Sequence, residues 1–183
     1  EALQQRIQQV AHAVSHCRSL PPALEKLVYQ DVLDLASATQ KLVPQGKELI
    51  VKLELFGPSV CVRWHRDGYV CRSIVSYNCT ATEYTADSNV DFYQMKNGGT
   101  NDDIIRDPSQ IRSIDVGDML MMKGMHYPGK AHSLVHKSPP ARYYNNQDFA
   151  PIHIRNKNVQ ARLILKVDVL KLRECEEKCC AGH

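Results

Sequence analysis

The sequence predicts an α+β fold in which two helices precede a barrel or jelly roll of short strands. Between residues 2 and 42, apolar residues recur at helical spacing, whereas from Glu48 onwards they alternate with polar residues as in half-buried strands. Many short strands separated by polar insertions are typical of barrels and jelly rolls, whose open end can hold one small ligand. No Gly-rich loop follows a strand, so a Rossmann or P-loop nucleotide site is not expected.

The N-terminal helices are predicted over residues 2–17 and 22–42. Leu3, Ile7, Val10 and Val14 repeat at helical spacing in the first. Pro21-Pro22 interrupts the chain and suits the start of the second helix, which Pro44-Gln45-Gly46 should end. Each helix has an apolar stripe that needs a surface to cover, so residues 1–47 should pack on the outside of the barrel as part of the same domain.

The barrel is predicted over residues 48–170. Its expected strands lie at residues 49–55, 60–65, 71–77, 90–93, 111–114, 119–123, 131–136 and 162–170. The polar segments 83–108 and 142–158 are interpreted as insertions, and residues 171–183 as a mobile tail that contains cysteines. On the last strand the apolar face should line the core, so Arg162 on the other face reaches a pocket only if the strand twists or bulges at its start.

Composition excludes several classes of protein. The 183 residues are 43% hydrophobic and 23% charged, which is an ordinary globular composition. A net charge of +3 is too small to favour nucleic acid as a partner, and no apolar run approaches the ~20 residues that a membrane span needs. The 7 cysteines are an odd number in a chain long enough to fold without disulfides, which favours reduced thiols and an intracellular compartment. The sequence indicates no oligomeric state.

The candidate site is a possible metal centre formed by His65, Asp67 and His136. His65 and Asp67 are two residues apart, so on an extended strand they point to the same face, and His136 from a later strand can complete the set. Two histidines and one carboxylate on one side of a metal leave the other positions open, as in non-haem Fe(II) oxygenases. His132 is an alternative to His136, whereas His153 should lie on the surface.

Other groups of potential ligands are weaker. His12 and His16 are one helical turn apart, which allows two imidazoles to share an ion. Soft ligands that zinc could gather occur in the tail, at Cys175, Cys179, Cys180 and His183. Cys61 and Cys71 flank the main site, where they are either thiolates near a metal or small buried apolar residues.

The order of these motifs resembles the double-stranded β-helix of the Fe(II)/2-oxoglutarate-dependent dioxygenases, a cupin-like fold. His65-Arg66-Asp67, Tyr77-Asn78 and the Gly117-Asp118 turn match elements of that family. Over residues 60–170 the chain is also similar to an uncharacterised family of bacterial and algal proteins with a Val-His-Arg-Ser-Pro-Pro-like element, here residues 135–140. Some bacterial relatives of that family are associated with zinc homeostasis.

The resemblance implies a specific chemistry. His65, Asp67 and His136 would hold Fe(II), and Arg162 would bind the distal carboxylate of the cosubstrate 2-oxoglutarate. Three further residues would line the pocket or orient the ligands: Arg72, Tyr77 and Ser138. The substrate would be a small molecule or a protein side chain. Two alternatives stay open: a Zn²⁺-dependent lyase or hydrolase that uses a metal-bound water on the same site, and a metal-binding protein of zinc homeostasis without turnover.

Overall fold

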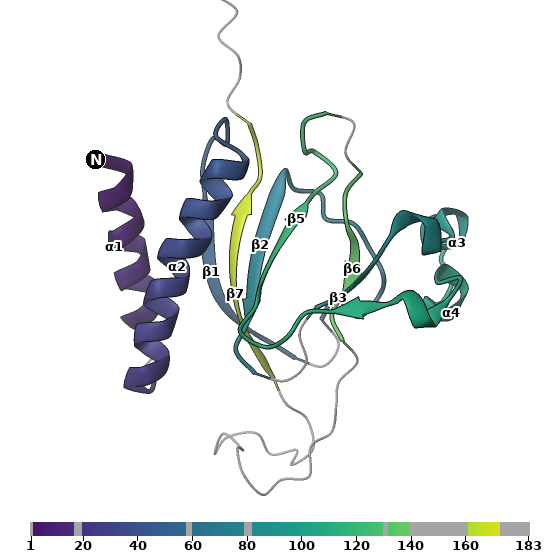
Figure 1. Ribbon diagram of the computed structural model, residues 1–183, viewed down its shortest axis with the longest axis horizontal. Coiled ribbons are helices and arrows are strands. Elements are labelled where there is room, and N and C mark those ends of the chain that lie inside the picture. The colour runs from purple at the N-terminus through teal and green to yellow at the C-terminus, as the bar shows by residue number, and fades with distance from the viewer. Residues whose placement is uncertain are drawn as a thin grey trace, which may run out of the picture.

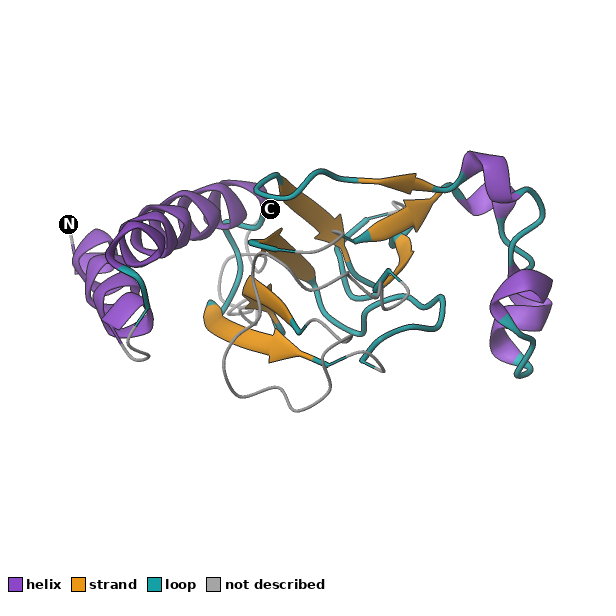
Figure 2. Ribbon diagram, turned by 90° about the horizontal axis from the view of Figure 1, so that it is seen from below, coloured by secondary structure: helices purple, strands orange, loops and turns teal. Residues whose placement is uncertain are grey.

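The computed structural model has two antiparallel sheets with helices at both ends of the molecule (Figure 1). It describes residues 2–16, 20–57, 60–78, 82–129, 132–139 and 161–172. Seen from below, the long N-terminal helices lie on one side of the strands and the short helices lie on the other (Figure 2). No helix among the described residues is long and apolar enough to cross a membrane.

The two N-terminal helices cover one face of the larger sheet. Helix α1 spans Ala2–His16 and α2 spans Pro22–Leu42, with Pro at the start of α2, as predicted. Buried side chains of both helices pack against inward residues of the sheet, in a cluster formed by Ala11, Val28, Val32, Leu35, Leu53, Val75, Leu165 and Val167. The apolar stripes of the helices are thus buried against the sheet, on its outer side.

The larger sheet has the strand order β1-β7-β2-β5, and all its pairs are antiparallel. Its strands are β1 (Ile50–Phe56), β2 (Cys71–Ser76), β5 (Met119–Lys123) and β7 (Arg162–Val169). The smaller sheet has the order β4-β3-β6, with β3 at Glu83–Thr85, β4 at Arg112–Ser113 and β6 at Val135–Lys137. Among the described residues these sheets do not close into a barrel.

The strand β7 is buried on both faces, which corrects the prediction for Arg162. Its apolar side chains, such as Leu165 and Val167, pack against the helices. The polar side chains of Arg162, Lys166 and Asp168 are also buried, on the face that looks towards the smaller sheet. Regular pairing with β1 begins at Arg162, opposite Phe56, so no bulge is needed to turn its side chain inward.

Two predictions for the middle of the chain were wrong. Residues 60–65 do not form a strand: Cys61 has a left-handed φ of 56°, and only His65 makes a β-bridge, with His136. Residues 83–108 are not an irregular insertion, and no strand covers 90–93. They contain β3, the 3₁₀ helix η1 (Asp87–Asn89), α3 (Phe92–Lys96) and α4 (Asn101–Ile104), and the 3₁₀ helix η2 (Pro108–Gln110) begins at their end.

This second unit of structure has its own core and its own local signals. Trp64, Val90, Ile104, Ile105 and Val135 form a buried cluster away from the N-terminal helices. The side chains of Asp91 and Thr100 cap α3 and α4, and Thr100 forms a capping box with Asp103. The core holds residues 60–66 against α3, α4 and β6, so it positions the segment that carries His65.

Candidate metal centre

His65 and His136 lie directly opposite each other in an isolated antiparallel bridge. Each backbone N–H donates to the carbonyl of the other residue, at 3.0 Å in both directions. Directly opposed residues project their side chains on the same side of the bridge. The two imidazole centroids are therefore only 4.5 Å apart, although His65 and His136 are distant in the chain.

Asp67 completes the group. Its Oδ1 lies 3.8 Å from Nε2 of His65, and its Oδ2 lies 3.4 Å from Nε2 of His136. One ligand atom from each of the three residues falls within 4.8 Å of the others. Ligand atoms held 2.0–2.2 Å from one ion lie about 3–3.5 Å apart, so small side-chain rotations would bring this set to bonding distance of a cation.

Backbone hydrogen bonds orient both imidazoles towards this point. Nδ1 of His65 lies 2.7 Å from the carbonyl oxygen of Arg63, and Nδ1 of His136 lies 3.1 Å from that of Leu134. A carbonyl only accepts, so each Nδ1 carries a proton, and each ring turns its Nε2 towards Asp67. Such outer partners are typical of metal-ligating histidines.

The electrostatics favour a neutral imidazole at His65 and a carboxylate at Asp67. Burial, and then the positive charge of a protonated His136, lower the pKa of His65, which keeps its ring neutral at neutral pH. Burial alone would raise the pKa of Asp67, but the hydrogen bond with His136 and the charge of Arg72 hold it below its ordinary value. The Asp67 carboxylate and the Nε2 atoms of both imidazoles therefore face one another. A cation bound to all three would displace the proton that His136 shares with Asp67.

Arg72 orients the Asp67 carboxylate through a charged hydrogen bond. Its Nη1 donates to Oδ2 of Asp67 at 2.9 Å, while Nε and Nη2 donate to the two oxygens of Asp168 at 2.7 and 3.1 Å. Asp168 is 1% exposed, and the guanidinium also lies over the ring of Tyr69. Arg72 was predicted to orient the ligands or line the pocket. It contacts one candidate ligand and lines the cavity described next.

A narrow cavity adjoins His65 and His136, between the two sheets. Its lining includes Arg162 and Ser138, and Arg162 donates to Oγ of Ser76 at 3.0 Å. The full lining consists of Phe56, Cys61, His65, Arg72, Ile74, Thr82, Met122, His136, Lys137, Ser138, Arg162 and Lys166. Only about 20 Å³ is free for a water-sized molecule, which is room for roughly one water.

The charged pairs around this cavity were not predicted from the sequence. The buried Lys137 and Lys166 form ion pairs with Glu83 and Glu54, respectively. A usable signal was present in β7, where Arg162, Lys166 and Asp168 share one face of an otherwise apolar strand. Charged residues on a face that the fold buries require partners, and a cavity is where such partners meet.

Tyr77 is placed elsewhere, which corrects its expected role in the pocket. Its hydroxyl donates to Oδ2 of Asp31 in α2 at 2.8 Å, and its ring packs against the core under the helices. Burial, and then the hydrogen bond to Asp31, raise the pKa of Tyr77 and keep the hydroxyl protonated. Tyr77 therefore links α2 to the outer face of the sheet.

The other candidate ligands that the structure describes do not join the group of His65, Asp67 and His136. His132 is exposed and lies 3.3 Å from Asp87, so His136 and not His132 belongs to the group. His12 and His16 stack with centroids 4.0 Å apart, and His16 pairs with Glu25. Burial, more than the nearby charge of Asp168, raises the pKa of Cys71 to about 11. His153, Cys175, Cys179, Cys180 and His183 lie outside the described residues.

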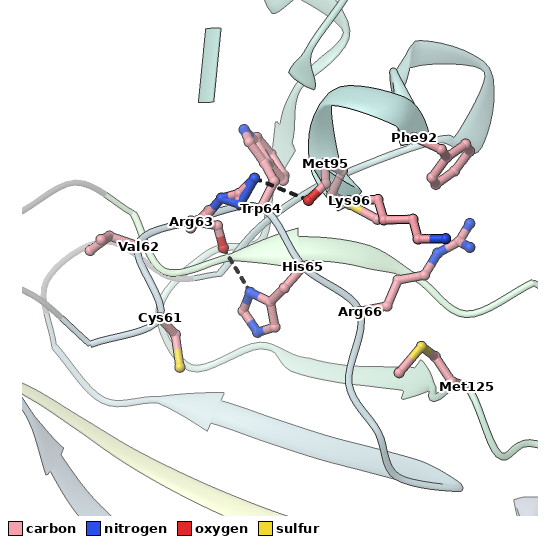
Figure 3. Close-up of a pocket in the computed structure, with 10 residues that line it drawn as sticks. All are labelled: Cys61, Val62, Arg63, Trp64, His65, Arg66, Phe92, Met95, Lys96 and Met125. Atoms are coloured by element: carbon pink, nitrogen blue, oxygen red, sulfur yellow. Dashed lines mark hydrogen bonds between the residues drawn. The ribbon is translucent and has the colours of Figure 1, made fainter. Parts of the chain in front are cut away.

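An open groove of about 800 Å³ adjoins the site on the outside (Figure 3). His65 and Cys61 belong to both the groove and the cavity, and the His65 side chain is 31% exposed. The groove is lined by Cys61, Val62, Arg63, Trp64, His65, Arg66, Phe92, Met95, Lys96 and Met125. His65 therefore lies between a narrow cavity that contains several charged side chains and an accessible, mainly apolar groove.

Comparison with known proteins connects the chain to one family. Residues 1–147 match the model of a family described as a protein of unknown function (DUF1826), and this match includes all three candidate ligands. No curated protein and no solved structure matches the chain. Because the match covers most of the 183 residues, the chain belongs to the DUF1826 family of proteins of unknown function.

Proposed function

We propose that this protein is an oxidoreductase of the Fe(II)/2-oxoglutarate-dependent dioxygenase type, built on a double-stranded β-helix that the two sheets represent. The observation that carries the proposal is the convergence of His65, Asp67 and His136 beside a cavity lined by buried cations. Two histidines and one carboxylate with an exposed side leave positions for a cosubstrate and O₂. When bound, the iron and 2-oxoglutarate supply the oxidative chemistry, while the protein binds, orients and excludes water.

Charge balance around the cavity supports an anionic cosubstrate. The buried cations Arg72, Lys137, Arg162 and Lys166 are matched in number by the carboxylates Asp67, Asp168, Glu54 and Glu83. A divalent ion at the site would add two positive charges to a nearly balanced interior. A dicarboxylate would restore the balance, and the planar guanidinium of Arg162 suits a carboxylate through two parallel hydrogen bonds.

Entry of a cosubstrate would require side chains to move. The cavity has room for about one water molecule, so 2-oxoglutarate fits only if long side chains swing aside. Lys137 and Lys166 are suited to this because each has a flexible four-carbon stem and is held by a single described ion pair. Ser138, on the lining, then offers a hydroxyl to an incoming carboxylate.

The small cavity also favours a second candidate function. Zinc with two histidines and a carboxylate commonly keeps one water, which it activates for hydration or hydrolysis. A space for one water beside His65, Asp67 and His136 is sufficient for that chemistry. The third alternative is zinc handling without turnover, which needs the same ligands and no cosubstrate.

Metal analysis and anaerobic titration test these proposals. The purified chain is loaded with Fe(II) without oxygen, and 2-oxoglutarate is added while visible absorption is followed. A saturable new band that is weak in Arg162→Ala, with the same iron content, supports the oxygenase. The variant Arg162→Lys, which keeps the charge, controls for folding, and His132→Ala should behave as the wild type. Tight zinc and no response to 2-oxoglutarate would refute the oxygenase and favour the zinc functions.

A further inference from the structure

The open groove beside His65 has a wall of apolar and aromatic side chains. Phe92, Met95 and Met125 line it together with Trp64, and Phe92 and Met125 remain 36% and 59% exposed. Exposed apolar side chains that gather in one concave surface are typical of ligand sites, because each leaves water when a ligand binds. The groove therefore has a mainly apolar surface and enough space for a small organic molecule.

The charges in the groove are of one sign. Arg63, Arg66 and Lys96 belong to its lining, and no acidic residue does. Arg66 pairs with Asp87 at 2.7 Å and lies over the Phe92 ring at 4.3 Å, so much of its charge is compensated. Lys96 makes no ion pair with any residue that the structure describes. Figure 3 shows the Lys96 amine and the Arg66 guanidinium at the same end of the groove.

Hydrogen bonds between residues 62–64 and the short helices fix the walls of the groove, and a ligand can bind without breaking them. Nη2 of Arg63 donates to the carbonyl of Met95 at 3.0 Å, a contact visible in Figure 3. Asn101 receives a hydrogen bond from the backbone N–H of Trp64 and donates to the carbonyl of Val62, at 3.1 and 2.9 Å. These contacts join residues 62–64 to α3 and α4, and such preorganisation lowers the entropy cost of binding.

We propose that this groove binds the substrate, and that the substrate is a small amphipathic monocarboxylate with an apolar body. Its carboxylate lies at the end formed by Lys96 and Arg66. Its apolar body lies along Phe92, Met95 and Met125, which leads towards His65. The assignment of this ligand as a substrate rests on the proposed oxygenase function, but its binding to the groove does not.

Octanoate is the probe for this proposal. Octylammonium, which has the same alkyl chain and the opposite charge, and acetate, which has the carboxylate without the long alkyl chain, are the control ligands. Trp64 is the single tryptophan of the chain and belongs to the groove, so its fluorescence reports binding directly. The full chain is titrated in the presence of EDTA, which prevents the carboxylate from binding an adventitious metal. We expect saturable binding of octanoate, at least about tenfold weaker binding of octylammonium, and none of acetate.

Variants of Lys96 make the test specific. Lys96 is exposed at the end of α3, so its replacement leaves the core unchanged. Lys96→Met should weaken octanoate binding about tenfold, which is the loss of affinity expected when one charged hydrogen bond is removed. Lys96→Glu should reverse the preference, so that octylammonium binds more tightly than octanoate. Lys41→Glu, on the exposed side of α2, is the matched control and should bind as the wild type. Equal binding of octanoate and octylammonium, or an unchanged affinity in Lys96→Met, would overturn the proposal.

The outcome is separable from that of the proposed function. Binding is measured without iron, 2-oxoglutarate or turnover, so it succeeds or fails independently of the oxygenase chemistry. Octanoate binding that depends on Lys96, in a protein that shows no response to 2-oxoglutarate, would support the groove and refute the oxygenase. A clear 2-oxoglutarate response with no octanoate binding would support the oxygenase and refute this substrate class.

Discussion

Replacing Arg72 with methionine should weaken both the fold and metal binding at the candidate site. Arg72 is 8% exposed and is the shared partner of Asp67 and Asp168. Methionine keeps the length and apolar stem of the side chain but removes all three charged hydrogen bonds. Asp168, which is 1% exposed, would then be a buried carboxylate without its cation.

The expected magnitudes follow from these contacts. Breaking one side of a buried ion pair costs about 3–5 kcal/mol, because the remaining charge is buried and uncompensated. A domain of this size has a free energy of unfolding of about 5–15 kcal/mol, so Arg72→Met should fold but with much reduced stability. Loss of the group that orients a metal-ligating carboxylate lowers metal affinity by about 10–100-fold, which is the expected effect through Asp67.

Urea unfolding of the metal-free protein and chelator competition for Zn²⁺ measure the two effects separately. The double variant Arg72→Met/Asp168→Leu should recover most of the stability, because no uncompensated charge then remains at Asp168. Its metal affinity should stay low, because Asp67 still lacks its partner. Arg112→Met, on the exposed strand β4, is the control and should change stability by less than about 0.5 kcal/mol.

A loss of less than about 1 kcal/mol in Arg72→Met, together with Zn²⁺ affinity equal to that of the wild type, would contradict the proposed role of Arg72. Such a result would mean that water or neighbouring groups compensate Asp168 and that Asp67 is oriented without Arg72. Recovery of both stability and metal affinity in the double variant would also contradict it, since the two effects would then share one cause.

Three further predictions concern single side chains. His136→Ala should lose most bound Zn²⁺ or Fe(II) by elemental analysis, whereas His132→Ala, outside the site, should retain it; equal losses would contradict the assignment. Because burial raises the pKa of Cys71 to about 11, iodoacetamide at neutral to mildly basic pH should modify the exposed Cys61 and spare Cys71. Peptide mass mapping measures the two modifications, and rapid labelling of Cys71 in the folded protein would contradict the prediction. Burial also raises the pKa of Asp31 above its usual 3.8, so the folded state holds that proton more tightly, and its contribution to stability is present below pH 3.8 and lost as pH rises through the folded pKa. Asp31→Asn should remove this part of the pH dependence of urea unfolding, and identical slopes in both proteins would exclude the effect.

Local sequence patterns were sufficient for the elements whose stability depends on their neighbours in the chain. Helix α2 begins at Pro22 as predicted, because proline suits the first helical position. Strand β5 has its predicted bounds, because period-two alternation of side chains is a property of the strand itself. His65 and Asp67 were found as a pair because residues only two positions apart in the chain cannot lie far apart, although the strand predicted over residues 60–65 is absent.

Tertiary structure decided the features that depend on distant partners. Residues 60–65 have the composition of a strand, but the backbone at Cys61 turns, and a separate core around Trp64 positions them instead. The alternation in β7 separates its two faces without indicating which one the helices cover, so the inward direction of Arg162 followed only from the packing of α2.

The cavity is the feature that local sequence patterns could least predict, because its lining comes from segments far apart in the chain. The pairing of β7 with β2 places Asp168 opposite Arg72. Lys166 in β7 and Lys137 in β6 line the same cavity because β6 lies across from β7. The sequence by itself determined the two N-terminal helices, most strands and the two nearby candidate ligands, because short-range sterics and periodicity decide them. The third ligand's position, the buried charge pairs and the groove depend on contacts between segments far apart in the chain, which only the folded structure brings together.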